Sequence, residues 1–333
     1  MSRRFLAVLA TFALVACTML GPAAAHATVK SAAGKKITVV LVAGITTDAF
    51  YLTMKRGAAA EAAKFGYNFQ FTGSPTAFSP QTQIPFLNAA IAKKPDFILI
   101  APTDKVALID PLLKAKAKGI RIITVDTFTL KDAQFAITNI SSDNILGGET
   151  AAKALATLVG SHGLVAGVSV TPGISTTDQR QRGFEMGLKA YPKITYLGTK
   201  FDNDMAPVAS TITKADLAAH KDLRGIFAMN VVSGDGVASA LEEAVRSGQI
   251  KKGQVKLVEF DAGPEQVAKL KRGLVDALVA QDPFDIGKIA VDMVHKFLTS
   301  GQAGIPKHIG TGEFTITRAN VDTPAAAKFE YRP

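Results

Sequence analysis

The sequence contains almost no cysteine and no tryptophan. Cys17 is the only thiol among the 333 residues, and it lies in an apolar N-terminal segment. A chain processed beyond this segment has no cysteine, which excludes disulfides, cysteine-ligated zinc and a cysteine nucleophile. A protein without thiols suits an oxidising compartment.

Common catalytic motifs are also absent. No Gly-x-Gly-x-x-Gly follows the first predicted strand, and neither a Gly-x-x-x-x-Gly-Lys phosphate loop nor a Gly-x-Ser-x-Gly elbow occurs. His162, His220, His295 and His308 lack the spacing of metal ligands. We therefore expect a protein that is not an enzyme and that uses no metal and no cofactor.

The N-terminus predicts a signal peptide over residues 1–27. A positively charged start and an apolar stretch over 5–20 lead to residues 25–27, which read Ala-His-Ala, the small-x-small pattern of a signal peptidase site. A second interpretation stays open, because residues 14–17 read Leu-Val-Ala-Cys, a lipobox pattern in which Cys17 would be lipidated. Both interpretations place the mature protein outside the cytoplasm.

The formal net charge of the chain is +10, and removal of the two leader arginines lowers it by two. The lysines are scattered over segments that read as exposed helix faces, with no arginine-rich tract. Such a distribution is typical of a solvated surface, so we expect no nucleic-acid partner.

Strand and helix patterns alternate along the mature chain, with apolar runs separated by periodic helical segments. This alternation requires crossover helices, and it predicts an α/β fold with mostly parallel sheets in two similar domains that meet near residues 141–144. The predicted strands cover 37–42, 69–71, 97–100, 121–125, 164–170, 225–228 and 255–260, and the predicted helices cover 51–65, 81–93, 105–118, 145–159, 179–190, 207–220 and 236–247.

Polar side chains recur where apolar strands end. Asp126, Asn230, Asp261 and Gln281 each close a strand-like run. Any one of them could equally be a turn residue or a helix cap. Because ligands in open α/β sheets bind outside the carboxyl ends of the strands, their joint occurrence predicts a shared cleft.

The residue types at these positions suit a ligand rich in hydroxyl groups. A carboxylate accepts hydrogen bonds from neighbouring hydroxyls, and a carboxamide both donates and accepts. Phe50 and Tyr51 follow the first strand, and aromatic rings pack on the C–H faces of sugars. We expect the Phe50 ring to face the ligand and not the core.

These residues form part of a longer pattern that resembles the ribose-type periplasmic sugar-binding proteins, the solute receptors of bacterial ABC importers. The resemblance covers essentially the whole mature chain. The matching stretches are Asp48-Ala49-Phe50-Tyr51, Lys55-Arg56-Gly57, Gly66-Tyr67-Asn68, Ala101-Pro102-Thr103-Asp104, 142–148, Arg180 with Gly183-Phe184, 226–230, 258–261 and 280–283.

The resemblance implies two Rossmann-like lobes of the periplasmic binding protein-like I fold, joined by three hinge crossings near Ser142, Gln281 and Thr311. The N-terminal lobe would contain 37–142 plus 282–310, and the C-terminal lobe 143–281 plus 311–333. Carried over position by position, the ligand contacts fall on Asp48, Phe50, Tyr51, Ala101, Asp126, Thr127, Asp178, Phe201, Asn230, Phe260, Asp261 and Gln281.

Some of these positions depart from the ribose pattern. Ribose receptors carry arginines where Thr127 and Asp178 stand here, and amides where Asp48 and Ala101 stand. The expected cleft therefore gathers carboxylates and lacks two cations. We expect a neutral sugar or sugar alcohol other than ribose.

The resemblance also implies a monomeric periplasmic receptor that delivers its ligand to an ABC permease in the inner membrane with its ATPase. Repressor effector domains share this fold, but no helix-turn-helix precedes Ile37. Two alternatives stay open: a carbohydrate-processing enzyme that uses Asp126 and Asp261 as acid and base, and a receptor that signals to a chemotaxis or kinase partner.

Overall fold

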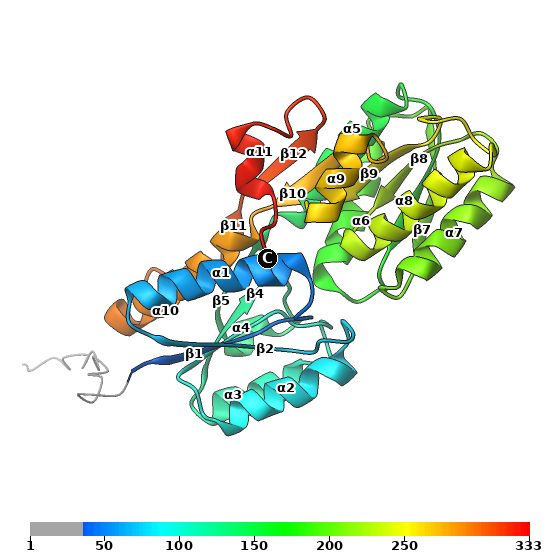
Figure 1. The fold of residues 1–333 in the computed structure, drawn as a ribbon. Helices are drawn as coiled ribbons and strands as arrows, with labels where there is room; N and C mark the ends of the chain where they lie inside the picture. Colours follow the sequence, from blue (N-terminus) through cyan, green and yellow to red (C-terminus); the bar gives the residue numbers. More distant parts are fainter. Residues whose placement is uncertain (1–35) are drawn as a thin grey trace, which may run out of the picture.

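The computed structural model describes residues 36–333 and contains two α/β lobes, each built on a six-stranded sheet (Figure 1). The first sheet has the strand order β11-β5-β4-β3-β1-β2, and all its pairs are parallel. Its elements are β1 (Thr38–Val42), α1 (Ala49–Lys64), β2 (Asn68–Thr72), α2 (Pro80–Ala92), β3 (Phe97–Ile100), α3 (Ile109–Ala117), β4 (Arg121–Val125), α4 (Asp132–Phe135), β5 (Ala136–Ser142), α10 (Pro283–Ser300) and β11 (His308–Thr311).

The second sheet has the order β12-β10-β9-β8-β6-β7, and only its β10–β12 pair is antiparallel. Its elements are α5 (Asn144–Leu158), β6 (Gly163–Ser169), α6 (Ser175–Leu188), β7 (Ile194–Phe201), α7 (Ala206–Ala219), β8 (Leu223–Ala228), α8 (Val231–Arg246), β9 (Lys256–Phe260), α9 (Pro264–Arg272), β10 (Ala277–Gln281), β12 (Glu313–Thr317) and α11 (Pro324–Phe329).

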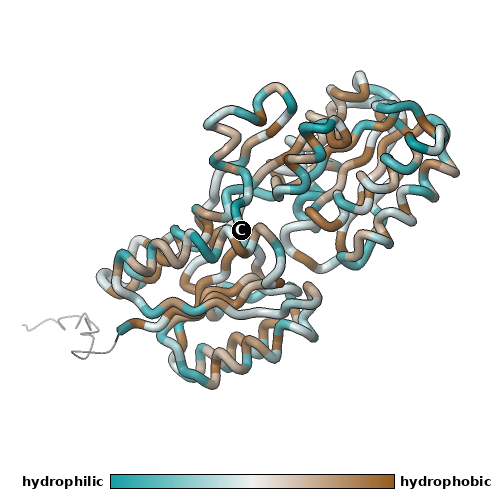
Figure 2. Tube along the Cα trace, in the orientation of Figure 1, coloured by the Kyte–Doolittle hydropathy of each residue, from teal (hydrophilic) through white to brown (hydrophobic). Residues whose placement is uncertain are grey.

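Both sheets are covered on both faces, which explains why their strands read as nearly continuous apolar runs. In β1, Val39 and Leu41 pack with α1 and α10, whereas Val40 and Val42 pack with α2 and α3. In the second lobe, α5 and α6 cover one face and α7, α8 and α9 cover the other. Figure 2 shows these apolar strands inside each lobe. The predicted α/β class with two lobes and mostly parallel sheets is confirmed.

Most predicted elements occur within a few residues of their expected bounds, and the strand predicted over 121–125 is β4. The helix α3 differs, since it begins at Ile109 and not at Lys105. Asp104 Oδ1 accepts hydrogen bonds from the backbone N–H groups of Val106 and Ala107, at 2.7 Å each. These bonds form a local turn, so the helix begins only after it.

The chain passes between the sheets at three places, from β5 to α5, from β10 to α10 and from β11 to β12. Thr311 pairs with Ser142 in the first sheet, while Glu313 pairs with Gln281 in the second. The third crossing therefore falls at Gly312. These positions agree with the three crossings expected near Ser142, Gln281 and Thr311.

The predicted signal peptide and the Cys17 lipobox lie outside the described residues. Within residues 36–333, no helix combines the length and the apolar character needed to span a bilayer.

Two glycines allow close packing of the helices next to the cavity, α1 against α10 and α6 against α5. A Cβ on Gly57 of α1 would lie 2.0 Å from the Phe284 carbonyl oxygen of α10. A Cβ on Gly183 of α6 would lie 2.0 Å from the Ile145 carbonyl oxygen of α5. Both helix pairs thus pack backbone to backbone, which only glycine permits.

Candidate functional site

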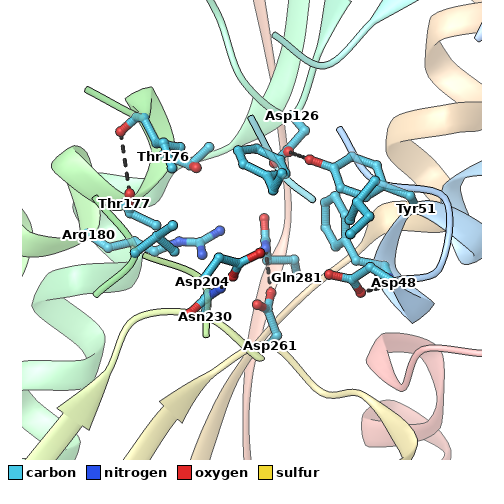
Figure 3. A pocket seen from close by; sticks show the side chains of 15 residues that line it. Asp48, Tyr51, Asp126, Thr176, Thr177, Arg180, Asp204, Asn230, Asp261 and Gln281 are labelled. Carbon is cyan, nitrogen blue, oxygen red and sulfur yellow. Dashed lines mark hydrogen bonds between the residues drawn. The ribbon is translucent and has the colours of Figure 1, made fainter. Parts of the chain in front are cut away.

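A cavity lies between the two lobes at the carboxyl ends of their central strands (Figure 3). The space between its lining residues measures about 490 Å³, and part of this space is open to solvent. Side chains from both lobes converge on it, as the strand-end pattern predicts. The lining residues are Ile45, Asp48, Phe50, Tyr51, Phe78, Asp126, Val170, Ile174, Thr176, Thr177, Arg180, Asp204, Asn230, Asp261 and Gln281.

Asp126 and Asp261 occupy similar places in the two lobes, directly after β4 and β9. Tyr51 Oη donates to Asp126 Oδ2 at 2.7 Å, and Gln281 Nε2 donates to Asp261 Oδ1 at 2.6 Å. Within residues 36–333, the second oxygen of each carboxylate accepts no hydrogen bond. One oxygen of each group is therefore free to accept a ligand hydroxyl.

The backbone at these carboxylates is strained. Asp126 and Asp261 have φ values of 62° and 80°, and Asp204 has a φ of 58°. This left-handed region is uncommon for residues other than glycine, although aspartate tolerates it better than most. Such strain clusters at functional sites, where the surrounding structure enforces it.

Asp48 and Asp204 add two further carboxylates to the cavity. Asp48 caps α1, because its Oδ1 accepts a hydrogen bond from Phe50 N at 2.8 Å. Asp204 Oδ1 accepts one from Asn230 Nδ2 at 2.9 Å. Asn230 Oδ1 in turn caps α8 by accepting from Ser233 N at 3.0 Å, so Asn230 is both a helix cap and a cavity residue.

Among residues 36–333, Arg180 is the only arginine or lysine that lines the cavity. Its side chain donates to Asn144 Oδ1 at 2.9 Å and to the Met229 carbonyl oxygen at 2.8 Å. The guanidinium lies 3.7 Å from the centroid of the Phe260 ring. This buried cation is held rigidly, and it partly offsets the four carboxylates.

Burial governs the titration of Asp48, Asp126 and Asp204. It raises the pKa of Asp48 to about 7, with the neighbouring carboxylates of Asp261, Asp204 and Asp126 adding to the rise. Burial also raises the pKa of Asp126 to about 6, although Arg180 and Tyr51 oppose it. The pKa of Asp204 is raised by burial as well. The cavity therefore resists a further negative charge.

The aromatic wall of the cavity differs from expectation in one respect. The Phe50 ring is 5% exposed and belongs to the core cluster of the first lobe, with its edge against Tyr51 at a centroid distance of 5.1 Å. Tyr51 stacks in turn with Phe78 at 6.4 Å. The expectation that Phe50 faces a ligand and not the core is corrected, because this ring both lines the cavity and fills the core.

Seven of the twelve predicted site residues line the cavity: Asp48, Phe50, Tyr51, Asp126, Asn230, Asp261 and Gln281. Their role as ligand contacts stays a prediction. The other five do not line it.

Three of these five are buried, and a fourth lies at the surface. Ala101 is buried and its carbonyl accepts a hydrogen bond from Gln83 Nε2. Thr127 is buried, and its hydroxyl has no partner within residues 36–333. Phe260 is buried beneath Arg180. Phe201 ends β7 and is 37% exposed at the surface.

The fifth, Asp178, was expected among the cavity carboxylates, and Asp204 takes that place. Asp178 pairs with Lys105 of the other lobe, with Oδ2 2.6 Å from Nζ. The sequence contains a signal for Asp204, since Asn203-Asp204 after a strand is typical of a left-handed turn. No local signal marks Arg180 as a cavity residue, because its position depends on the packing of α5 against α6.

The sequence pattern of the periplasmic binding protein domain matches residues 39–303, about four-fifths of the chain. The chain belongs to this family. Among curated relatives of this periplasmic binding protein, the ribose import binding protein of Salmonella typhimurium is 29% identical over 281 residues, which cover 84% of the chain and 91% of the relative. That of Bacillus subtilis is 28% identical over 291 residues, covering 87% and 90%.

Solved structures extend the similarity to proteins with bound sugars. An ABC transporter solute-binding protein from Agrobacterium vitis bound with α-D-tagatopyranose is 44% identical, with a TM-score of 0.84 over 90% of this chain and 100% of that one. A carbohydrate transporter solute-binding protein from Agrobacterium radiobacter in complex with D-arabinose is 27% identical, with a TM-score of 0.81 over 88% and 98%.

The rim of the cleft in this periplasmic binding protein carries direct contacts between the lobes, away from the crossings. Besides the Lys105–Asp178 ion pair, Lys105 N donates to the Gly173 carbonyl oxygen at 3.3 Å. Phe128 N donates to Ser175 Oγ at 3.0 Å. These contacts form only when the lobes are together, so they stabilise the closed arrangement.

We expect loss of the Lys105–Asp178 pair to weaken ligand binding by up to about fivefold, because partly exposed ion pairs contribute about 0.2–1 kcal/mol. Asp178→Asn and Lys105→Met should each produce this loss, and the double variant should add little. Isothermal titration at low and high salt measures it, with salt weakening the unmodified protein more than the variants. Additive losses in the double variant would contradict the pairing.

Proposed function

We propose that this protein is the substrate-binding protein of an ABC importer, and that it binds one neutral sugar or sugar alcohol between its two lobes. The observation that carries the proposal is the shared cavity, which Asp126 lines from one lobe and Asp261 from the other. A ligand that bridges them stabilises the closed form. The closed form then docks on a membrane permease, whose ATPase drives uptake.

The composition of the cavity supports a hydroxylated ligand. Four carboxylates and two carboxamides supply acceptors and donors for hydroxyl groups, while Phe50, Tyr51 and Phe78 supply apolar surface. Binding proteins for tagatopyranose and D-arabinose among the similar structures support the same ligand class. Arg180 supplies one cation to the cavity, whereas Thr127 stands where the resemblance to ribose receptors implies a second arginine, so we expect ribose not to be the preferred sugar.

The moving units in this proposal are residues 37–142 with 282–310 and residues 143–281 with 311–333. The three crossings between them act as a hinge. The protein works as a monomer in the periplasm. It reaches that compartment through the signal peptide, with cleavage after Ala27 or lipidation of Cys17.

A thermal-shift screen of the mature protein tests the proposal. The panel contains neutral pentoses, hexoses, pentitols and inositols. A ligand at 100 times its dissociation constant should raise the free energy of unfolding by about 2.7 kcal/mol. Failure of every neutral sugar and polyol to stabilise the protein would contradict the proposed function.

Sugar acids are expected not to bind under the same conditions. The cavity holds four carboxylates and one arginine, and a ligand carboxylate would be desolvated beside like charges. Glucuronate and gluconate are matched to glucose and glucitol in size, so the four compounds isolate the effect of charge. Tight binding of either acid would refute this charge argument.

A further inference from the structure

We propose that Tyr331 is a positioning residue for ligand binding, which holds the Asp261 carboxylate in its binding orientation although it does not line the cavity itself. This inference rests on the proposed function. It extends the proposed function, because it assigns the segment 324–333 a part in ligand binding. Figure 1 shows this segment returning to the space between the lobes, where the C label lies.

Tyr331 acts on one oxygen of Asp261. Its hydroxyl donates to Asp261 Oδ1 at 2.7 Å, and Gln281 Nε2 donates to the same oxygen at 2.6 Å. Two donors on Oδ1 fix the rotation of the carboxylate, and they leave Oδ2 without a partner within residues 36–333. The free oxygen is the one available to the cavity, which Asp261 lines.

The same arrangement exists on the opposite side of the cavity. Tyr51 Oη donates to Asp126 Oδ2 at 2.7 Å, and both aspartates adopt left-handed backbone conformations. The Phe50 ring joins the two pairs, with its edge against Tyr51 at 5.1 Å and against Tyr331 at 5.6 Å between centroids. A continuous series of contacts therefore links the carboxylates of the two lobes.

Tyr331 is placed by contacts to both lobes. Its backbone N–H donates to the Ala262 carbonyl oxygen at 3.0 Å, beside Asp261 in the second lobe. The next residue, Arg332, donates from its backbone N–H to Thr53 Oγ1 of α1 at 2.8 Å, and Arg56 donates to the Arg332 carbonyl oxygen at 2.5 Å. The segment thus adds a further noncovalent connection between the lobes.

Tyr331 is buried, with 3% of its surface exposed, so its hydroxyl has few alternative partners to Asp261. A buried hydroxyl without an acceptor carries a desolvation penalty. This penalty favours the conformation in which Tyr331 donates to Asp261. Burial and the nearby Asp261 charge raise the pKa of Tyr331 well above its usual range, so the hydroxyl stays a donor.

The test is Tyr331→Phe, which removes the hydroxyl and keeps the ring. The best neutral sugar from the screen serves as the probe in isothermal titration. We expect an affinity loss of roughly fivefold or more, because Asp261 then loses one of the two donors that hold its carboxylate in orientation, which weakens its hydrogen bond to the ligand. Tyr67→Phe is the matched control, since it removes a tyrosine hydroxyl bonded to His295 away from the cavity and should leave affinity unchanged.

A double-mutant cycle separates positioning from a general structural effect. If Tyr331 acts through Asp261, Tyr331→Phe should change affinity less than about twofold in the Asp261→Ala background. Equal losses in both backgrounds, or wild-type affinity in Tyr331→Phe, would overturn the inference and leave the proposed function intact. Absence of sugar binding by the unmodified protein would overturn both.

Discussion

Asp126→Asn and Asp261→Asn are each expected to weaken sugar binding roughly tenfold or more while the fold is retained. Each substitution replaces a charged acceptor by a neutral one, and hydrogen bonds to charged groups contribute about 1.5–3 kcal/mol. Asparagine also tolerates the left-handed backbone found at both positions, so the turn is preserved. Isothermal titration measures the affinity, and circular dichroism checks the fold.

Asp110→Asn is the matched control for these variants, because Asp110 is exposed in the first turn of α3. This variant should bind the sugar with unchanged affinity. If Asp126→Asn and Asp261→Asn also keep wild-type affinity, the ligand does not contact these carboxylates, and the cavity is not the binding site.

Asp48→Asn is expected to stabilise the ligand-free protein near pH 8 and to have much less effect near pH 5. The pKa of Asp48 is raised to about 7 by burial, whereas an unfolded aspartate titrates near 4. At pH values between these two pKa values, Asp48 holds a proton in the folded state and has released it in the unfolded state. Stability therefore falls as the pH rises through this window. The complete penalty, of order 2–4 kcal/mol, is present above about pH 7.

Urea denaturation of both proteins at the two pH values measures this effect. Asparagine keeps the helix cap, so the comparison isolates the charge of Asp48. Burial also raises the pKa of Asp202, Glu259 and Glu313, and those groups contribute equally to the two proteins. An identical pH dependence in the variant would show that Asp48 is not held at a raised pKa.

The sequence predicted the buried strands well because burial on both faces produces continuous apolar runs. β4 and β9 are such strands, and their bounds were predicted within one residue. The half-buried edge strand β7 has no such run. β5 carries polar residues in its second half, up to the crossing between the lobes at Ser142, so it has no continuous apolar run either.

The cavity was predictable wherever a polar residue directly follows a buried strand, as Asp126 and Asp261 do. Asp178 was misplaced because its partner, Lys105, lies on the other lobe, and only the closed arrangement brings the two together. Tyr331 had no local signal at all, since it reaches Asp261 across 70 residues of sequence. Contacts of this kind depend on how segments far apart in the chain pack together.

A crystal structure of the protein with its best neutral sugar tests the central claim most directly. We predict one sugar between the lobes, with hydroxyl oxygens about 2.5–3.0 Å from both the Asp126 and the Asp261 carboxylates. The Asp261 oxygen that contacts the sugar should be the one that Tyr331 leaves free. A sugar that contacts only one lobe, or that lies outside this cavity, would contradict the account.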